Sequence, residues 1–422
     1  MSTQAAPRDT EPSALPEGVE IVLDLSRLLS RTLHAMPTGI DRVELVYARQ
    51  LLARIPDRLR FAAVNPFGVY GRLPAQAVRR FLDETEDRWA SRAAPGRPAM
   101  LSAAAASLLR LAPRPVPRPA PGVRRYYLQA SPHHLHRPDR VRAKLLAERA
   151  RLVCLVHDLI PIEYPEYARP DGAAKHRRRI RTMADLAAGL IANSRATADS
   201  MARFLDGSHP VAIRVAHLGS EALAGGEDAP PPIPHPYFVM LGTIEPRKNH
   251  LLLLNLWRQM IETRGAERTP HLAIVGRRGW ENENIVDMLE RCTAIHGHVH
   301  ELAGLSDRAV GALLRHARAL LLPSFAEGFG MPVTEALQAG TPVICSDLPA
   351  LREAGGDVPD FLDPLDGPGW LEAISDHAGE GSVRRARQFE RLRDWTPPTW
   401  AAHIATVLEL VRDIDADGGD RR

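Results

Sequence analysis

The strongest constraint on the fold of this chain is an alternation of short apolar runs with amphipathic stretches, which occurs in two separate series. The first series predicts strands at residues 19–26, 61–65, 126–130, 152–156 and 186–192, with helices at 40–55 and 196–205. The second series predicts strands at residues 237–241, 271–276, 299–302, 319–322 and 341–345, with helices at 249–262 and 284–295. This order predicts parallel sheets that are covered by helices.

A stretch rich in Ala, Gly, Asp and Pro, residues 219–236, separates the two series and is typical of a linker. The 422 residues are also too many for one ordinary core. We therefore predict an α/β protein with two doubly wound, Rossmann-like domains that face each other across a cleft. The predicted domains are 18–222 and 236–398, and the predicted disordered tails are 1–17 and 415–422.

The composition excludes several classes of protein. The chain has no run of eighteen apolar residues, and its first sixteen residues are polar and rich in Pro, so we expect neither a membrane span nor a signal peptide. The three cysteines are far apart, which favours a reducing compartment. A net charge of +3 is too small to indicate a nucleic-acid partner. We expect a cytoplasmic protein.

Two glutamates separated by seven residues, Glu327 and Glu335, follow the apolar run 319–322. Pro332 suits the first turn of a helix, which places Glu327 in the loop after a strand and Glu335 one turn into the helix. Both carboxylates and the backbone amides of 328–331 then border the carboxyl edge of a parallel sheet, where open α/β sheets bind ligands. The alternative is a surface turn followed by an exposed helical glutamate.

A second loop, residues 242–250, follows the strand at 237–241 and carries Arg247 and Lys248 just before a helix that Asn249 is predicted to cap. Two cations beside the positive end of a helix form a strong site for a diphosphate. Lys248 is one of only three lysines in the chain. A solvated basic turn is the alternative interpretation.

The first half offers weaker signals. Thr38 is placed to cap a helix with Asp41 three residues later, and Gly39 between them allows the backbone to approach a ligand closely. His157 and Asp158 end a predicted strand, where a histidine can hydrogen-bond a hydroxyl or tune a developing charge. A plain capping motif and a structural His-Asp pair are the alternatives.

Other constellations are discounted. His133, His134 and His136 lie on a segment flanked by prolines, and their spacing gives poor metal-ligand geometry. The chain has no P-loop and no dinucleotide fingerprint. Ser194 lacks the sequence context of a nucleophile elbow.

Taken together, these motifs resemble the retaining GT-B glycosyltransferases of family 4. The resemblance covers residues 237–374 closely, through the segments 242–250, 304–307, 323–324, 327–335, 339–343 and 361–364. It is looser in the first half, through 38–41, 157–161 and 193–194. The form Glu-Pro-Arg-Lys-Asn-His at 245–250 is similar to bacterial polysaccharide mannosyltransferases.

The resemblance implies roles for the residues after the later strands. Glu335 would accept hydrogen bonds from the ribose of a nucleotide-sugar donor. Glu327 would hold the donor sugar through its hydroxyls, beside the amides of Phe329, Gly330 and Met331.

It also implies that Lys248 neutralises the diphosphate, that Gly39 approaches the same group from the other domain, and that His157 contacts the sugar near the reacting carbon. Asp158 and Asp41 would lie on the acceptor side. The family often has an arginine directly after the glycine at 242, where this chain has Thr243. The remaining residues that we expect on the donor side are Thr243, Gly276, Arg247 and Arg277, and either arginine could substitute for the missing one.

The resemblance implies a metal-independent, retaining hexosyltransferase without cofactors, in which the leaving phosphate takes the acceptor proton. We expect GDP-mannose as the donor, with UDP-hexoses and dTDP-rhamnose as alternatives. The expected acceptor is an oligosaccharide or a lipid-linked glycan in bacterial surface polysaccharide synthesis. A GT-B sugar-nucleotide epimerase and a catalytically silent nucleotide-sugar-binding subunit are the alternative functions.

Two segments bear on the acceptor side. Residues 100–111 fit an amphipathic helix that lies on the cytoplasmic face of the inner membrane, and the alternative is a mobile connector. The helix predicted at 399–413 would pack back on the first domain, as the resemblance implies.

Overall fold

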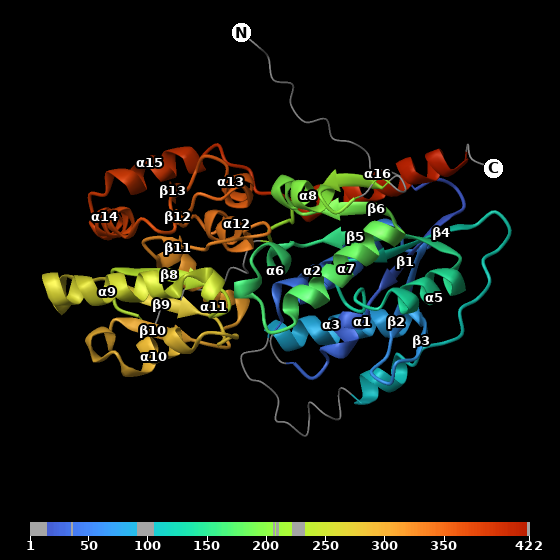
Figure 1. Cartoon of the computed structure of the whole chain (residues 1–422), viewed down its shortest axis with the longest axis horizontal. Coiled ribbons are helices and arrows are strands. Elements are labelled where there is room, and N and C mark those ends of the chain that lie inside the picture. Colours follow the sequence, from blue (N-terminus) through green and yellow to red (C-terminus); the bar gives the residue numbers. More distant parts are fainter. Residues whose placement is uncertain are drawn as a thin grey trace, which may run out of the picture.

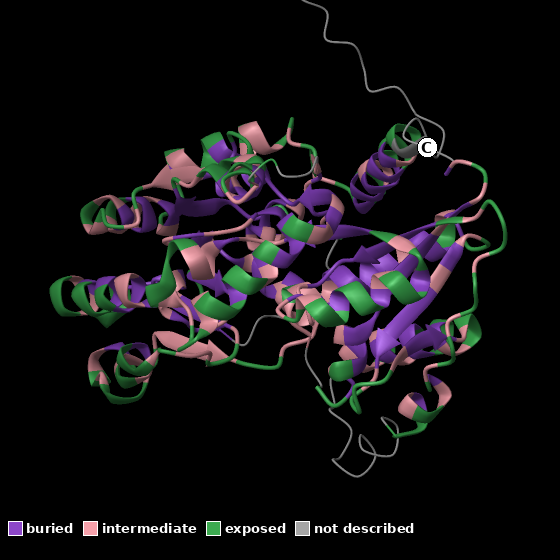
Figure 2. Cartoon of the chain, turned by 45° about the vertical axis from the view of Figure 1, so that its right-hand side comes forward, coloured by how far each residue is buried: buried purple, intermediate pink, exposed green. Residues whose placement is uncertain are grey.

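Two β-sheets packed with helices lie side by side in a computed structural model, which describes residues 15–34, 37–90, 105–205, 207, 211–221 and 233–419 (Figure 1). Strands β8 (Tyr237–Leu241) and β11 (Leu320–Leu322) are buried along their whole length. Figure 2 shows buried strands in both sheets and helices whose outer faces are exposed. The predicted α/β class with parallel sheets is confirmed.

The first sheet has seven strands in the order β3-β2-β1-β4-β5-β6-β7, and all pairs are parallel except the edge pair of β2 and β3. Its strands are β1 Val19–Asp24, β2 Leu59–Val64, β3 Tyr70–Leu73, β4 Arg124–Gln129, β5 Ala150–Val156, β6 Ala187–Ala192 and β7 Ala212–Val215. The second sheet has six parallel strands in the order β10-β9-β8-β11-β12-β13. Besides β8 and β11 it contains β9 His271–Val275, β10 Val299–Leu302, β12 Val343–Ser346 and β13 Asp360–Leu362.

Helices connect the parallel strands, whereas a turn joins β2 to β3. Those of the first half are α1 Ser26–Ser30, α2 Gly39–Arg54, α3 Ala75–Ala90, α5 Pro138–Glu148, α6 Ile160–Glu163, α7 Gly172–Leu186 and α8 Arg195–Ala202. Those of the second half are α9 His250–Arg264, α10 Glu283–Arg291, α11 Asp307–His316, α12 Met331–Gln338, α13 Pro349–Gly355, α14 Gly367–Ala378 and α15 Val383–Leu392. The last helix is α16 Trp400–Gly419.

The strand order reverses once in each sheet, at its first strand. Strand β1 lies between β2 and β4, and β8 lies between β9 and β11. Such switch points open a crevice at the carboxyl ends of the strands, because the connections leave in opposite directions there. The loop with Lys248 follows β8 and the loop with Glu327 follows β11, so both lie at the switch point of the second sheet.

Helix α16 packs against α2, β6 and β7 of the first half (Figure 1). Gly189 in β6 allows this close approach, because a Cβ atom there would lie 2.5 Å from Ile414 Cδ1. The Tyr47 hydroxyl and His403 Nε2, 2.6 Å apart, join α2 to α16 inside the contact.

Residues 15–17 and 415–419 of the two predicted tails are ordered, which corrects the prediction of disorder for those residues. Leu15 is buried, and the carbonyls of Leu15 and Pro16 accept hydrogen bonds from Arg58. At the other end α16 continues to residue 419, where Asp415 accepts a 2.6 Å hydrogen bond from Arg124 Nε. Residues 1–14 and 420–422 lie outside the described residues.

The sequence prediction missed β3, β7 and β13, which are all edge strands. The strand predicted at 19–26 ends at Asp24, because the Asp24 carboxylate accepts a 2.7 Å hydrogen bond from the Ser26 amide and α1 begins there.

The described part of the segment 100–111 packs on the protein. Leu111 is buried, and Ser107 and Arg110 both donate hydrogen bonds to Glu84 of α3. Residues 100–104 lie outside the described residues. Within the part of the chain that the structure describes, no helix has the length and apolar character needed to cross a membrane.

Candidate active site

A buried cluster of charges lies where β8 and β11 end. Lys248 Nζ is 2.6 Å from Glu327 Oε1, and Arg247 Nη1 is 3.0 Å from Glu327 Oε2. The Ser324 hydroxyl donates a 2.6 Å hydrogen bond to the same carboxylate, and Arg247 also pairs with Glu245 at 2.7 Å. One carboxylate is therefore held by two cations and a hydroxyl.

Glycines allow the loops of this cluster to press together. Gly242 has φ +140°, and a Cβ atom there would lie 3.2 Å from Lys248 Cε. A Cβ atom on Gly276 would lie 1.8 Å from the Gly242 carbonyl oxygen, so only glycine fits. Asn249 precedes α9 as predicted, but its side chain does not cap the helix; it adopts φ +59° and donates to the Pro364 carbonyl.

The ionisation of the cluster follows from its charges. Burial raises the pKa of Glu327, but the charges of Arg247 and Lys248 outweigh burial and hold that pKa at about 2. Burial lowers the pKa of Lys248, and the nearby Arg247 acts in the same direction, against the attraction of Glu327. Because Glu327 stays ionised at all physiological pH values, it cannot serve as a general acid.

Glu335 lies in the first turns of α12, as predicted. The helix starts after Gly330, which has φ +108°, and has a proline in its first turn. Burial raises the pKa of Glu335 to about 7, and Asp307 adds to this shift against the cations Arg42 and Lys248. Arg42 Nη2 donates a 2.5 Å hydrogen bond to Asp307 and so links α2 to α11 across the two halves.

His157 follows β5 and is held in one tautomer. Its Nε2 lies 2.7 Å from the Ala130 carbonyl oxygen, which can only accept a hydrogen bond. Nε2 therefore carries the hydrogen, and Nδ1 is left as an acceptor. Burial lowers the pKa of the ring, which favours this neutral form. The His157 carbonyl in turn accepts a 2.8 Å hydrogen bond from Asn193 Nδ2.

The predicted capping motif at α2 is present. Asp41 is fully buried and accepts hydrogen bonds from Arg27 at 2.6 Å and from the Thr38 amide at 2.7 Å. The carboxylate thus positions the Thr38 turn from inside the protein. A Cβ atom on Gly39 would lie 3.9 Å from Met331 Sδ, so this turn faces the start of α12 in the other half.

Asp158 also has a local partner. Its Oδ1 accepts a 3.1 Å hydrogen bond from the Ile160 amide, at the start of the short helix α6. The Asp158 carbonyl oxygen lies 3.0 Å from His176 Nε2.

The two halves touch directly beside this site. The Gly328 carbonyl accepts hydrogen bonds from Ser194 Oγ at 2.7 Å and Thr197 Oγ1 at 3.1 Å. A Cβ atom on Gly328 would lie 2.3 Å from the His157 carbonyl oxygen, so this glycine permits the contact. The buried ring of Phe329 stacks on His217, with ring centroids 5.5 Å apart. The Glu327 loop is therefore clamped against the end of β5 and the start of α8.

The two remaining arginine candidates differ in their surroundings. Arg247 is bound inside the cluster, whereas Arg277 is exposed. Burial lowers the pKa values of Arg31 and His34 in the first half, and the charge of Arg277 acts in the same direction. The neighbouring Arg278 pairs instead with Glu290 and Glu301. Thr243 lies against Gly279, where a Cβ atom would be 2.6 Å from Thr243 Cγ2.

Sequence reasoning missed several residues of the site. Ser324 and Thr197 are among them, as are Arg42 and Asp307. The segments 304–307 and 323–324, which contain Asp307 and Ser324, enter the sequence analysis only as parts of a motif, and Arg42 follows Thr38 by four residues. Their roles depend on contacts between distant parts of the chain, which local patterns do not reveal.

Residues 228–357 match the sequence model of a family described as glycosyl transferases group 1. The chain carries a group 1 glycosyltransferase domain. This group 1 domain contains the whole Lys248–Glu327 cluster and Glu335, and it confirms the resemblance drawn from the motifs.

Curated relatives of this chain include bacterial mannosyltransferases. O-antigen chain mannosyltransferase B of Escherichia coli is 39% identical over 142 residues, which are 33% of this chain and 35% of the relative. Phosphatidyl-myo-inositol mannosyltransferase of Mycolicibacterium smegmatis is 31% identical over 177 residues, which are 40% and 43% of the two chains. The aligned part thus spans less than half of each of these relatives.

Solved structures share the fold of this chain over nearly its whole length. HepE of Anabaena, solved with UDP-glucose, has a TM-score of 0.57 at 14% identity and covers 95% of this chain and 99% of its own. Sucrose-phosphate synthase of Thermosynechococcus elongatus has a TM-score of 0.59 at 16% identity, with coverages of 94% and 99%. The likeness confirms the GT-B fold with two Rossmann-like halves. The roles predicted for individual residues stay predictions.

Proposed function

We propose that this protein is a retaining, metal-independent hexosyltransferase that transfers a sugar from a nucleotide diphosphate donor. The observation that carries the proposal is the Lys248–Glu327 pair at the switch point of the second sheet, clamped against the end of β5 that bears His157. In this pair the Lys248 ammonium would stabilise a leaving group, and the Glu327 carboxylate would accept hydrogen bonds from sugar hydroxyls. Both groups lie in one buried site.

The proposed chemistry uses charges that are already in place. Departure of a nucleoside diphosphate leaves negative charge on the phosphates, which Lys248, Arg247 and the amino end of α12 would stabilise. The donor would separate Lys248 from Glu327, so that the ammonium contacts phosphate and the carboxylate contacts sugar hydroxyls. Arg277 would supply the charge that Thr243 lacks. No proton is needed on a diphosphate leaving group, and these side chains can supply the charge without a metal.

The acceptor would enter beside His157. The bare Nδ1 atom of His157 can accept a hydrogen bond from a donor-sugar hydroxyl near the reacting carbon. The acceptor hydroxyl would attack the front face of the sugar and give its proton to the leaving phosphate. Because Glu327 is fixed by two cations and Ser324, we propose that it positions the sugar and forms no covalent bond with it.

The proposed donor is GDP-mannose, and the proposed product is part of a bacterial surface polysaccharide. The relatives support this choice, since they are named as mannosyltransferases of O-antigen chains or of phosphatidyl-myo-inositol. UDP-hexoses stay open because the structural neighbour HepE was solved with UDP-glucose. We also propose that each sheet with its helices is a domain, with α16 as part of the first, and that the protein works in the cytoplasm.

The test is donor turnover by the full chain with GDP-mannose, UDP-glucose and dTDP-rhamnose, preceded by thermal-shift screening. We expect one donor to raise Tm and to be consumed when an acceptor glycan is added, with the anomeric configuration of the product retained by NMR. Release of free nucleotide with an epimerised sugar would identify the epimerase alternative. Binding without turnover for any acceptor would identify the silent subunit.

A further inference from the structure

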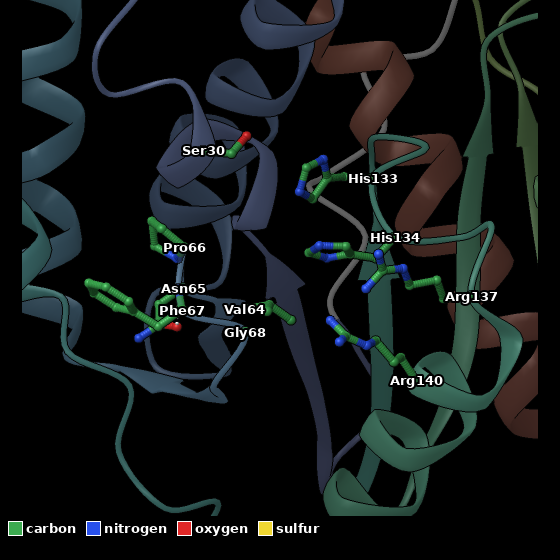
Figure 3. Close-up of a pocket in the computed structure, with 10 residues that line it drawn as sticks. All are labelled: Ser30, Val64, Asn65, Pro66, Phe67, Gly68, His133, His134, Arg137 and Arg140. Carbon is green, nitrogen blue, oxygen red and sulfur yellow. Dashed lines mark hydrogen bonds between the residues drawn. The ribbon is translucent and has the colours of Figure 1, made fainter. Parts of the chain in front are cut away.

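A cavity of about 420 Å³ lies on the first sheet, away from the Lys248–Glu327 cluster (Figure 3). Its walls come from the segments that follow the carboxyl ends of β1, β2 and β4. Its size falls within the range of small-molecule sites. The lining residues used below are Asn65, Phe67, His133, His134, Arg137 and Arg140.

One wall of the cavity is cationic. Arg137 is the residue before α5 and Arg140 lies in its first turn, and both side chains point toward the 65–68 turn in Figure 3. The amino end of the helix adds a partial positive charge. Among the described residues neither guanidinium forms an ion pair, whereas Arg142 on the same helix pairs with Asp139 at 3.6 Å. The charges that line the cavity are thus uncompensated.

His134, which also lines the cavity, has an unusual backbone conformation and a ring nitrogen that the described residues leave unsatisfied. His134 has φ +63°, a left-handed conformation that is costly for a residue with a side chain. Its buried Nδ1 has no hydrogen-bond partner among the described residues. Burial and the charge of Lys144 hold the pKa of His134 at about 4, so the ring is neutral. His134 thus lines the cavity with a strained backbone and with a buried Nδ1 that no described residue satisfies, and both features suit a functional loop.

The opposite wall is apolar at its rim. Phe67 is 87% exposed, which is unusual for a phenylalanine. Asn65 fixes the turn that carries it, because Asn65 Oδ1 accepts hydrogen bonds from the amides of Phe67 at 3.0 Å and Val69 at 2.9 Å. A rigid turn therefore presents an aromatic ring to solvent at the rim of the cavity. In Figure 3 the turn faces the arginines, and the Phe67 ring points outward from it.

The loop after β4 connects this cavity to the proposed reaction centre. Ala130, at the start of the loop, holds His157 through its carbonyl oxygen. Three residues later His133 begins the wall of the cavity, and its own carbonyl accepts a hydrogen bond from Gln129. The loop 130–134 therefore contacts His157 at its start and lines the cavity at its end.

We propose that the cavity binds a phosphate or diphosphate group of the acceptor, held by Arg137 and Arg140, with Phe67 against the organic part next to it. Guanidinium groups match the geometry of phosphate oxygens, and the helix end adds to the attraction. The proposal rests on the proposed function, since it assigns the substrate class of that same reaction. The phosphate could belong to a soluble phosphorylated sugar or to a lipid diphosphate.

The first experiment measures the binding of inorganic diphosphate by calorimetry, with the donor site filled by a saturating nucleoside diphosphate. We expect the double variant Arg137→Gln/Arg140→Gln to weaken diphosphate binding about tenfold or more, because each lost charge-assisted hydrogen bond weakens binding by about that factor. Arg142→Gln is the matched control and should bind as the unaltered protein does. Equal diphosphate affinity in the double variant and the control, with unchanged Tm in both, would overturn the proposal.

A second comparison separates the two sources of the phosphate. Geranyl diphosphate should bind more tightly than inorganic diphosphate if the acceptor is lipid-linked, and Phe67→Ser should remove that gain alone. Equal affinities would assign the site to a soluble phosphorylated acceptor. Diphosphate binding that depends on Arg137 and Arg140 would support the cavity as a phosphate site even if no nucleotide sugar is turned over. Failure of the proposed function can therefore be distinguished from failure of this inference.

Discussion

The carboxyl edges of the two sheets use charge in opposite ways. On the second sheet, Glu327 is buried between Lys248 and Arg247, so that opposite charges are matched before any ligand arrives. On the first sheet, Arg137 and Arg140 are exposed around an open cavity and have no ion-pair partner among the described residues. The two edges belong to sheets with the same doubly wound order, so the difference lies in the loops and not in the architecture.

The difference follows from what each edge is proposed to bind. A leaving diphosphate has the same shape in every turnover, and a buried, preorganised cluster stabilises it without reorganisation. An acceptor is larger, and its structure varies from one substrate to another. An open cationic wall can bind such a molecule, but it holds the acceptor less rigidly than a buried site would. On this view changes in the second sheet reduce kcat, whereas changes in the first mainly alter acceptor binding.

The largest expected effect is that of Lys248→Met. We expect kcat to fall by about 10²–10³, the usual effect of removing one preorganised charge from a developing anion. Stability should fall by about 3 kcal/mol, because Glu327 is left buried with fewer partners. Both quantities are measured by donor-turnover kinetics and by denaturant unfolding.

Two further variants make this prediction decisive. Lys175→Met removes a lysine that is exposed in α7 and should leave both quantities unchanged. The double variant Lys248→Met/Glu327→Gln should recover most of the stability but none of the activity. If kcat of Lys248→Met stays within threefold of normal, the cluster does not stabilise the leaving group.

The next effect is expected from Gly328→Ala, which acts on the contact between the two edges. A Cβ atom would lie 2.3 Å from the His157 carbonyl oxygen, so the Glu327 loop must move away from the first half. A shift of that size misaligns the reacting groups, and we expect kcat/KM to fall about 10²-fold.

Gly381→Ala is the matched control, because a Cβ atom there has no neighbour within 4 Å. A Gly328→Ala enzyme with normal kcat/KM would mean that the observed contact is not the one used in turnover.

Sequence patterns predicted the second edge better than the first. Lys248 and Glu327 were placed at one sheet edge because apolar runs, a proline and glycines mark the ends of strands and helices locally. The sequence did not reveal that these two side chains bind each other, since 79 positions separate them. Strand β7, whose residues are only partly buried or exposed, lacks the apolar run that made the central strands visible.

In the first half, a sequence pattern could indicate either a helix cap or a functional residue, and only the tertiary structure distinguishes the two. The spacing of Thr38 and Asp41 is right for a cap, and the cap is present. The spacing did not reveal the ion pair between Asp41 and Arg27, because that pair depends on how α1 packs against α2. The cavity at Arg137 was missed altogether, because it is assembled from three separate loops.

A smaller and pH-dependent effect is expected from Glu335→Gln. The normal carboxyl has its pKa raised from 4.5 to about 7, and it accepts ribose hydrogen bonds best when ionised. Donor KM of the unaltered enzyme should therefore fall between pH 6 and pH 8, whereas that of the variant should stay flat and be about tenfold higher at pH 8.

Glu335→Gln should weaken donor binding but raise the free energy of unfolding at high pH. A carboxyl with a raised pKa contributes stability that is complete below pH 4.5 and is lost as the pH rises through 7. At pH 8 the variant should be more stable than the unaltered protein by about 1–2 kcal/mol, a value reduced from the full shift because the side chain is only half-buried. A donor KM that varies with pH in the variant as it does in the unaltered enzyme would exclude Glu335 as the titrating group.

The smallest effect is expected from Asp158→Asn, and it tests whether the first edge takes part in proton transfer. The observed hydrogen bond from the Ile160 amide needs only one side-chain oxygen, which asparagine retains. With the leaving phosphate as the base, kcat should fall by no more than about threefold, since one hydrogen-bonded oxygen is kept and no proton passes through the carboxylate. A loss of a hundredfold or more, with unchanged Tm, would make Asp158 a catalytic base and would move part of the chemistry from the second sheet to the first.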